Sequence, residues 1–327
     1  MVLVAGNISL ASKIILIPTL SITFIYGTIG NILVCMAIFK NHNMKTATNG
    51  FILSLAIADL AVCTITVPLA LFSLFQDPRP LAALVAGEVA LSAVSCSLLQ
   101  LAIISVDRYR GIVHPEKARL QWSQVKYIIP PLWIFAIAET CIVVFNWKYN
   151  IWFALMHFVW FWFIAIVTMF CYGLIWRRIK THNKAVGNSL ARNREERLKN
   201  ERKSIKMIIL VLGCLVLCWT PATIVYGLFI ISYRINKELS NSMRQPLNVL
   251  VAFGYFNSCV NPLIYAVMNT SFRKSFQQIL TSNCLCRGVG KILIFQTSPY
   301  TGNIVRTQVK PASIVSNKTA SSFIREH

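Results

Sequence analysis

Charged residues are scarce in this sequence. Only 13% of its 327 residues are charged and 56% are hydrophobic, and the mean hydropathy is +0.60. A soluble globular domain usually carries about 25% charged residues. The composition therefore excludes an ordinary soluble protein and indicates a chain that crosses a membrane several times. The sequence also lacks a basic domain with interleaved aromatic residues, which counts against nucleic acid as a partner.

Acidic residues are scarcer still, since 11 Asp and Glu stand against 32 Lys and Arg, for a formal net charge of +21. With seven spans and the N-terminus outside, six of the 32 basic residues fall outside and the other 26 inside. This positive-inside bias predicts that orientation, so the net charge mainly reports topology. The six outer residues are Lys13, Arg79, Lys148, Arg234, Lys237 and Arg244.

Seven apolar stretches are long enough to cross a bilayer, for which a helix needs roughly 20 residues. We therefore predict an all-α membrane protein, built as a seven-transmembrane helix bundle. The fourth and fifth stretches are separated by almost nothing, so hydropathy alone leaves six or eight spans open. The stretches are about 14–39, 47–75, 80–106, 127–146, 151–176, 205–232 and 246–268.

The first 13 residues lack a basic segment and a cleavage site, so no cleavable signal peptide is expected. Residues 1–13 are predicted to form an extracellular N-terminal arm, followed by a transmembrane domain at 14–280. Asn7-Ile8-Ser9 in the arm is a glycosylation sequon, which predicts a glycan on Asn7.

The segment after the last span is amphipathic. Residues 271–280 place basic and polar side chains on one helical face and apolar side chains on the other, at the spacing of a helix that lies in the membrane interface. We therefore predict a short interfacial eighth helix. Its apolar face consists of Phe272, Phe276, Ile279 and Leu280.

Residues 281–327 are polar and rich in Ser and Thr, and we expect a disordered cytoplasmic tail. Cys284 and Cys286 begin this tail, where a cysteine pair beside the membrane is a candidate for palmitoylation. Two unmodified thiols are the alternative. The other eight cysteines lie in apolar stretches and are expected to be free thiols that pack as small hydrophobic groups.

A few polar residues interrupt the spans, where ionisable groups are costly and usually functional. Asp59 lies in the middle of the second span and needs hydrogen-bond donors from inside the bundle. A carboxylate surrounded by amides and water can hold a sodium ion. A purely structural polar knot that joins helices is the alternative. The expected partners are Asn31, Asn257, Ser258 and Asn261.

Two prolines fall inside spans. Pro221 lies in the sixth span, close to Cys218 and Trp219, and Pro262 lies in the seventh. Each proline removes a backbone hydrogen bond and is expected to bend its helix. A bent helix in a membrane can act as a hinge.

Short motifs follow one another along the chain, one in each span. They are "GN" with Asn31, "LAIADL" with Asp59, "DRY" at 107–109 followed by Pro115, Trp133, Tyr172, "CWTP" at 218–221 and "NPLIY" at 261–265, followed by Phe272. Each motif is weak alone, but chance does not produce all of them in order. Over about residues 14–280 the chain resembles a rhodopsin-like (class A) seven-transmembrane G-protein-coupled receptor.

The resemblance implies a role for the DRY arginine, Arg108. In the family this arginine is held at rest by its neighbouring aspartate, here Asp107, and often by an acid on helix six, here Glu201. On activation helix six moves outward and the arginine helps to receive a heterotrimeric G protein. A basic residue that merely snorkels at a helix end is the alternative. The other residues that the resemblance assigns to coupling are Tyr109, Tyr172 and Tyr265.

The resemblance also implies arrestin and receptor kinases as partners at the plasma membrane, in addition to the membrane lipids.

Two family features are absent. Ala83 stands where most members have the cysteine of an extracellular disulfide, and Ile164 replaces the usual proline of span five. Melanocortin, lysophospholipid and cannabinoid receptors share some of these absences.

The ligand is less well indicated. Ala90 occupies the position of the aspartate that pairs amines, and Tyr255 that of the lysine that binds retinal, which counts against both ligands. The remaining expected pocket residues are mostly apolar or aromatic, which suits a lipid-like or largely apolar ligand. The candidates are Glu88, Ala90, Leu91, Val94, Glu139, Met156, His157, Trp160, Trp219, Thr223, Tyr226, Val251 and Tyr255.

Three of these pocket candidates have open roles. Glu88 and Glu139 either pair a cationic ligand or are satisfied by their neighbours. His157 is either a ligand contact or a structural residue.

Other functional classes find less support. A transporter should show repeated halves or broken helices in matching positions, and no matching halves are found. No metal-ligand cluster, nucleophile elbow or phosphate loop indicates an enzyme, and no cofactor is expected apart from the sodium ion. A seven-helix protein that signals without a ligand, or that does not couple, remains the alternative to a ligand-operated receptor.

Overall fold

A computed structural model of the protein describes residues 8–75, 80–113, 120–146, 151–182, 191–235 and 237–282. The predicted glycosylation site Asn7, the predicted palmitoylation sites Cys284 and Cys286 and the rest of the tail lie outside the described residues. The predicted domain boundaries at those ends therefore stay predictions.

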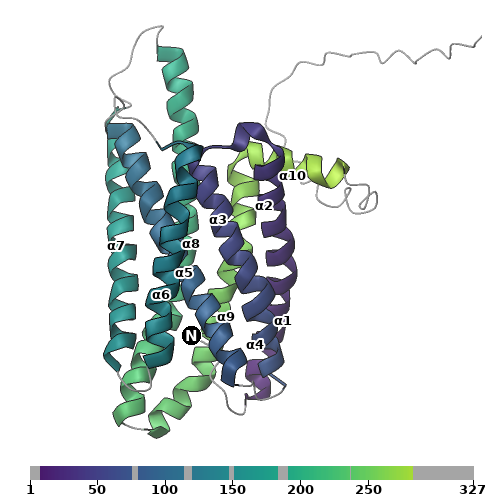
Figure 1. Cartoon of the computed structure of the whole chain (residues 1–327), viewed down its shortest axis with the longest axis vertical. Helices are drawn as coiled ribbons and strands as arrows, with labels where there is room; N and C mark the ends of the chain where they lie inside the picture. The colour runs from purple at the N-terminus through teal and green to yellow at the C-terminus, as the bar shows by residue number, and fades with distance from the viewer. Residues whose placement is uncertain are drawn as a thin grey trace, which may run out of the picture. The chain divides into compact units, whose positions relative to one another are not determined.

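Seven helical segments in these ranges are long and apolar enough to cross a membrane, which confirms the predicted fold class (Figure 1). The first two spans are each interrupted by a π-helical turn. They consist of α1 (Leu10–Ile22), η1 (Thr23–Gly27) and α2 (Thr28–Lys40), and of α3 (Ala47–Ala61), η3 (Val62–Thr66) and α4 (Val67–Ser73). The other spans are α5 (Pro80–Val113), α6 (Trp122–Asn146), α7 (Ile151–His182), α8 (Ala191–Ile235) and α9 (Lys237–Met268).

The bilayer environment explains why the spans are helical. Inside a bilayer every backbone N–H and C=O needs a partner within the protein, and a helix supplies it locally. The closely spaced fourth and fifth stretches form two separate helices, α6 and α7, so the count is seven. The helices α7 and α8 also continue past their apolar portions, Phe158–Ile175 and Arg202–Ser232.

The π-helical turn η3 was not predicted. It ends at Thr66, just before Pro68 in the first turn of α4. A proline inside a helix has no N–H to donate and its ring collides with the carbonyl four residues earlier. Widening the helix by one residue relieves both problems. By contrast, Pro221 and Pro262 lie inside continuous helices α8 and α9, so the bends expected there stay predictions.

Two helices organise the bundle. The seventh span, α9, packs along α8 and also contacts α1 and α2. The third span, α5, packs against α3, α6 and α7. Both carry buried polar side chains as well as buried apolar ones, among them Gln100 on α5 and Asn261 on α9. The third and seventh spans, the most enclosed of the seven, therefore carry polar groups into the interior of the bundle.

Glycines allow the close approach of several spans. A Cβ atom at Gly30 would lie 2.9 Å from two ring carbons of Pro262 on α9, and one at Gly50 would lie 2.8 Å from Val125 on α6. Real Cβ atoms do not come so near. By contrast, Gly213 on α8 has open space where a Cβ would be. Small residues of this kind let helices in membranes pack closely.

The short helix α10 (Thr270–Ser282) follows α9 and lies beside the end of α2 (Figure 1). Most of its predicted apolar face, Phe272, Phe276 and Ile279, is buried against the bundle, and only Leu280 is exposed, at 38%. The face assigned to the membrane interface is thus largely used for packing within the protein. The interfacial position of this helix stays a prediction.

We predict that Gly30→Ala lowers the free energy of unfolding by about 1–3 kcal/mol, because the added methyl group meets the rigid ring of Pro262 and pushes the first and seventh spans apart. Gly213→Ala is the matched control. It adds the same methyl group in open space and should be neutral or stabilise by up to about 1 kcal/mol through helix propensity. Thermal unfolding of the purified protein measures both, and equal melting temperatures for the two variants would contradict the packing argument.

Candidate coupling site and polar core

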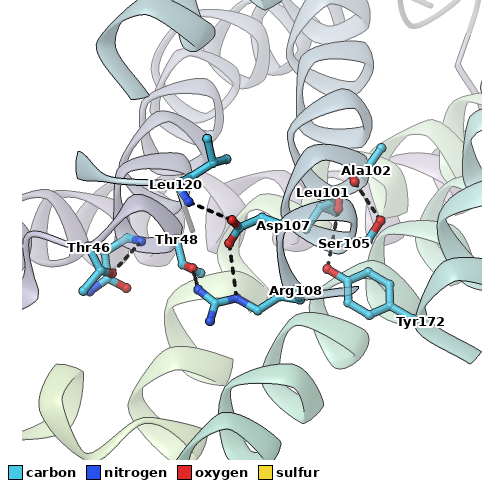
Figure 2. Close-up of polar contacts among 10 residues, drawn as sticks. Thr46, Thr48, Leu101, Ala102, Ser105, Asp107, Arg108, Leu120 and Tyr172 are labelled. Carbon is cyan, nitrogen blue, oxygen red and sulfur yellow. Dashed lines mark hydrogen bonds and ion pairs between the residues drawn. The ribbon is translucent and has the colours of Figure 1, made fainter. Parts of the chain in front are cut away.

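The arginine of the DRY motif is held at the end of α5. Its Nε lies 3.9 Å from Oδ2 of Asp107, and its guanidinium donates a hydrogen bond to the hydroxyl of Thr48 at the start of α3 (Figure 2). The side chain of Arg108 is only 16% exposed. A snorkelling arginine would extend into water instead, so this geometry favours a specific role.

Local structure fixes both partners of Arg108. Thr48 lies in the first turn of α3, whose N-terminus is capped by the Thr46 hydroxyl, which accepts from the N–H of Asn49 at 3.3 Å. The other carboxylate oxygen of Asp107 accepts a hydrogen bond from the N–H of Leu120, at 3.1 Å. The motif thus ties the end of α5 to the start of α3 and to the segment that leads into α6 (Figure 2).

The expected acidic partner, Glu201, lies on α8, but its side chain is outside the described residues, so the Arg108–Glu201 pair stays a prediction. Sequence reasoning missed Thr48. Thr48 lies 60 residues before Arg108 in the sequence, in a helical turn that carries none of the family motifs. The sequence therefore does not indicate that the two residues are in contact.

The coupling tyrosines have separate surroundings. The hydroxyl of Tyr172 on α7 donates to the backbone carbonyl of Leu101 on α5, at 3.5 Å (Figure 2). Tyr265 on α9 is buried and stacks on Phe272 of α10, with ring centroids 5.3 Å apart. Tyr109 is half-buried on α5. Tyr172 and Tyr265 therefore each hold a contact between helices that a rearrangement would have to break.

A second polar cluster lies deeper in the bundle. The amide of Asn261 on α9 donates to Oδ2 of Asp59 on α3, at 2.8 Å. The amide of Asn31 on α2 donates to the backbone carbonyl of Ser258, at 2.8 Å, and to that of Gly27, at 2.9 Å. Hydrogen bonds of this length join the first, second and seventh spans.

Several oxygens of this polar core lack a protein donor. The carboxamide oxygens of Asn31, Asn257 and Asn261 are buried and have no hydrogen-bond partner among the described residues. Buried polar atoms are nearly always satisfied, so these unpaired oxygens fit water or a hard cation, which takes oxygen ligands. The donor set therefore suits the expected sodium ion.

The residues around the predicted hinge pack tightly. Trp219 on α8 is buried and meets Tyr255 of α9 edge-on, with ring centroids 6.0 Å apart. A Cβ atom at Gly254 would lie 3.0 Å from the Trp219 ring, so the glycine admits the indole. Cys218, directly before Trp219, is half-buried, and Pro221, two residues after Trp219, is exposed.

Residues 30–150 and 137–265 of the chain match the 7 transmembrane receptor (rhodopsin family), and together they cover more than half of its length. The chain belongs to this receptor family. Neuromedin-U receptor 2 of Rattus norvegicus is 26% identical over 301 residues, which make up 81% of this chain and 74% of that receptor. The alpha-1A adrenergic receptor of Oryzias latipes is 25% identical over 335 residues, or 86% and 70% of the two chains.

Family membership sets aside the enzyme and transporter alternatives and makes the protein a multi-pass membrane receptor. The eight cysteines of the receptor's described spans are all free thiols, as expected.

The pocket candidates of the receptor come from five helices, α5 to α9. Ala90, Leu91, Val251 and Tyr255 are buried, whereas Met156 is 65% exposed. The side chain of His157 lies outside the described residues. The half-buried candidates are Glu88, Val94, Glu139, Trp160, Thr223 and Tyr226.

Both acidic candidates have partners within the receptor. Oε1 of Glu88 accepts from the hydroxyl of Thr140 on α6, at 2.5 Å, and from that of Ser92, at 2.9 Å. Oε2 of Glu139 accepts from the hydroxyl of Ser95, at 3.3 Å. The bonds from Thr140 and Ser95 join α5 to α6, whereas the bond from Ser92 lies within α5. They support the reading in which neighbours satisfy the two acids, but Glu88 is satisfied only in part, because its Oε2 is buried without a hydrogen-bond partner among the described residues.

We predict that Thr140→Val destabilises the receptor by about 1.5–3 kcal/mol, because it removes one of the two hydroxyl groups that donate to the half-buried carboxyl group of Glu88. Thr64→Val is the control, since the exposed Thr64 hydroxyl bonds only the carbonyl of Leu60 in its own helix. Thermal melts in one detergent compare the two, and similar melting temperatures would show that the bond to Glu88 adds no stability.

Proposed function

We propose that this receptor activates heterotrimeric G proteins, which bind where α5 presents Asp107 and Arg108. The observation that carries the proposal is the placement of Arg108, a mostly buried cation bonded to Thr48 of another span. A charge held in this way can be released by a change in helix packing. Family membership supports the same function, since the matching family is one of receptors.

In this proposal, activation moves the inner part of α8 outward. The Arg108–Glu201 pair and the Arg108–Thr48 bond break, and Tyr172 and Tyr265 leave their present contacts to join Arg108 at the G protein. Each bond near water contributes little, roughly 0–1 kcal/mol for an ion pair. That is enough to bias two states that differ by a few kcal/mol. Pro221 and Pro262 provide the bends.

The proposed setting is the plasma membrane, with the N-terminus outside and the tail in the cytoplasm. The charge distribution supports this orientation. Asn7 would carry a glycan, Cys284 and Cys286 would be palmitoylated, and receptor kinases and arrestin would act on the tail.

The proposed ligand is lipid-like or largely apolar. The names of the two relatives point to different ligands, neuromedin U and an adrenergic agonist, so neither carries over. Support comes from the receptor's own residues: Ala90 offers no charge for an amine, and Glu88 and Glu139 are bonded within the protein. Signalling without a ligand is the second candidate, because the sequence lacks the extracellular disulfide.

We predict that Thr48→Val raises basal G-protein activation about fivefold, the effect of losing one bond worth about 1 kcal/mol. Arg108→Ala should lower it and Glu201→Ala should raise it. The assay uses cells that express each variant at matched surface levels, without ligand, across the four alpha-subunit classes.

Thr64→Val is the control for this assay, because Thr64 is exposed on η3 and bonds only within its own helix. If Thr48→Val and Thr64→Val give equal basal activation, the bond from Arg108 to Thr48 does not hold the receptor in its resting state. If the wild type, Thr48→Val and Glu201→Ala all fail to activate any of the four alpha-subunit classes, the proposal that the ligand-free receptor couples to G proteins is contradicted.

We also propose that the polar core around Asp59 holds a sodium ion. The unpaired oxygens of Asn31, Asn257 and Asn261 support it, because they are the ligand type that sodium takes. A bound ion would stabilise the arrangement in which Asp59 contacts Asn261 and would oppose movement of α9.

Sodium should therefore raise the melting temperature of the purified wild-type receptor relative to choline at equal ionic strength. Asp59→Asn should abolish this difference, because the anionic ligand is gone. Glu88→Gln, a carboxyl-to-amide change at another acid within the spans, should keep it. A wild type that melts at the same temperature in both salts has no sodium site.

A further inference from the structure

The first part of α5 packs against the last part of α6, in the half of the bundle opposite to Arg108 (Figure 1). Three oxygens meet at this interface. Oε1 of Glu88 on α5 lies 2.5 Å from Oγ1 of Thr140 on α6 and 2.9 Å from Oγ of Ser92 on α5, and the two hydroxyl oxygens are 2.7 Å apart. Ser92 and Thr140 are buried. The carboxyl group of Glu88 is therefore held between two spans by buried hydroxyl groups.

Hydrogen-bond donors reach only one oxygen of this carboxyl group. Both hydroxyls lie at Oε1, whereas Oε2 is buried and has no partner among the described residues. The single hydrogen of the Thr140 hydroxyl is also shared with the carbonyl oxygen of Ala136, at 2.8 Å. An ionised carboxylate carries charge on both oxygens and offers about four acceptor positions. Two hydroxyls on one side do not satisfy such a group when its other oxygen is buried.

No cation offsets a charge on Glu88 within the described part of this region. Residues 80–106 of α5 and 132–146 of α6 contain no Lys, Arg or His. The last part of α6 instead presents a second acid, Glu139, and a thiol, Cys141, that interacts with the Glu88 carboxyl group. A negative charge on Glu88 would therefore lie near another acid and opposite no base.

The other elements that pack against α5 add few titratable side chains in this half of the bundle. α4 has none, and Asp59 of α3 belongs to the polar core. The side chain of His157 on α7 lies outside the described residues. The remaining groups are Cys63 of η3 and Tyr226 of α8. None of these described groups carries a positive charge that would stabilise an ionised Glu88.

We propose that Glu88 binds a proton at Oε2, so that it is a neutral carboxylic acid in the folded receptor at neutral pH. In a carboxylic acid the carbonyl oxygen accepts hydrogen bonds and the other oxygen carries the hydrogen. Oε1, with two donors, has the surroundings of the carbonyl oxygen, and Oε2, with none, has those of the hydroxyl. A proton needs no cavity, which suits an oxygen enclosed by protein. Cys141 offers its sulfur as a weak acceptor.

This proton makes the stability of the receptor depend on pH. In the unfolded chain Glu88 is exposed to water and is ionised above about pH 5. The folded receptor therefore binds one proton more than the unfolded chain, and it loses stability as the pH rises. Each pH unit lowers the ratio of folded to unfolded receptor about tenfold through this proton, until the proton leaves the folded receptor for water as well. The G protein plays no part in this dependence, so the proposal stands apart from coupling.

Infrared difference spectra of the full-length receptor in phosphatidylcholine nanodiscs test the protonation state at neutral pH. A carboxylic acid and a carboxylate have separate carbonyl-stretch bands. Subtracting the Glu88→Gln spectrum from that of the wild type should leave the band of a carboxylic acid. Glu238→Gln, the same change at an exposed acid of α9, should leave only carboxylate bands. Carboxylate bands alone for Glu88→Gln would overturn the proposal.

The double variant Asp59→Asn/Glu139→Gln guards against misfolding of Glu88→Gln. It keeps Glu88 and removes the other two acids of the spans outside the DRY motif. Its spectrum should retain a carboxylic-acid band at neutral pH, and loss of that band would show that Glu88 is ionised.

Melting temperatures from about pH 5 to about pH 8 test the link to stability. The amide of Glu88→Gln resembles the neutral acid but has no proton to lose, and Asp59 titrates alike in both proteins. The melting temperature of the wild type should therefore fall progressively below that of Glu88→Gln as the pH rises. Parallel curves would overturn the proposal, since Glu88 would then hold no more protons in the folded receptor than in the unfolded chain.

Discussion

The bilayer leaves no water for polar groups inside it, so each must find a partner within the protein. The bundle meets this requirement with a small number of hydrogen bonds between spans. Asp59 accepts the amide of Asn261, and Glu88 accepts the hydroxyl of Thr140. Each bond fixes the register of two helices, because a shift by one residue would leave a buried group unpaired.

Close packing at small residues also holds these helices together. Gly30 admits the ring of Pro262, and Gly254 admits the indole of Trp219, so α9 lies close to both the first and the sixth spans. Without a hydrophobic force between helices in lipid, such close packing is a main source of association. The seventh span therefore connects the polar core to the helix that is proposed to move.

The proposed function depends on how firmly Arg108 is held. A bond to Thr48 and a contact with Asp107 are each weak near water. A strong latch would trap one state, whereas weak bonds let a ligand or a G protein shift the balance. The polar core and the Arg108 site share α3, which carries both Asp59 and Thr48, so a change in the position of α3 reaches both.

The sequence by itself determined the helical class and the receptor family, because hydropathy and span-specific motifs are local properties of the chain. It predicted seven spans but left six or eight open until the structure separated α6 from α7. It also indicated that Asp59 would need donors from the seventh span, as Asn261 provides. Only the tertiary structure decided that Arg108 bonds Thr48 and that η3 is π-helical. It also turned most of the apolar face of α10 toward the bundle and exposed its basic face. These features depend on contacts between residues far apart in sequence, which no local pattern encodes.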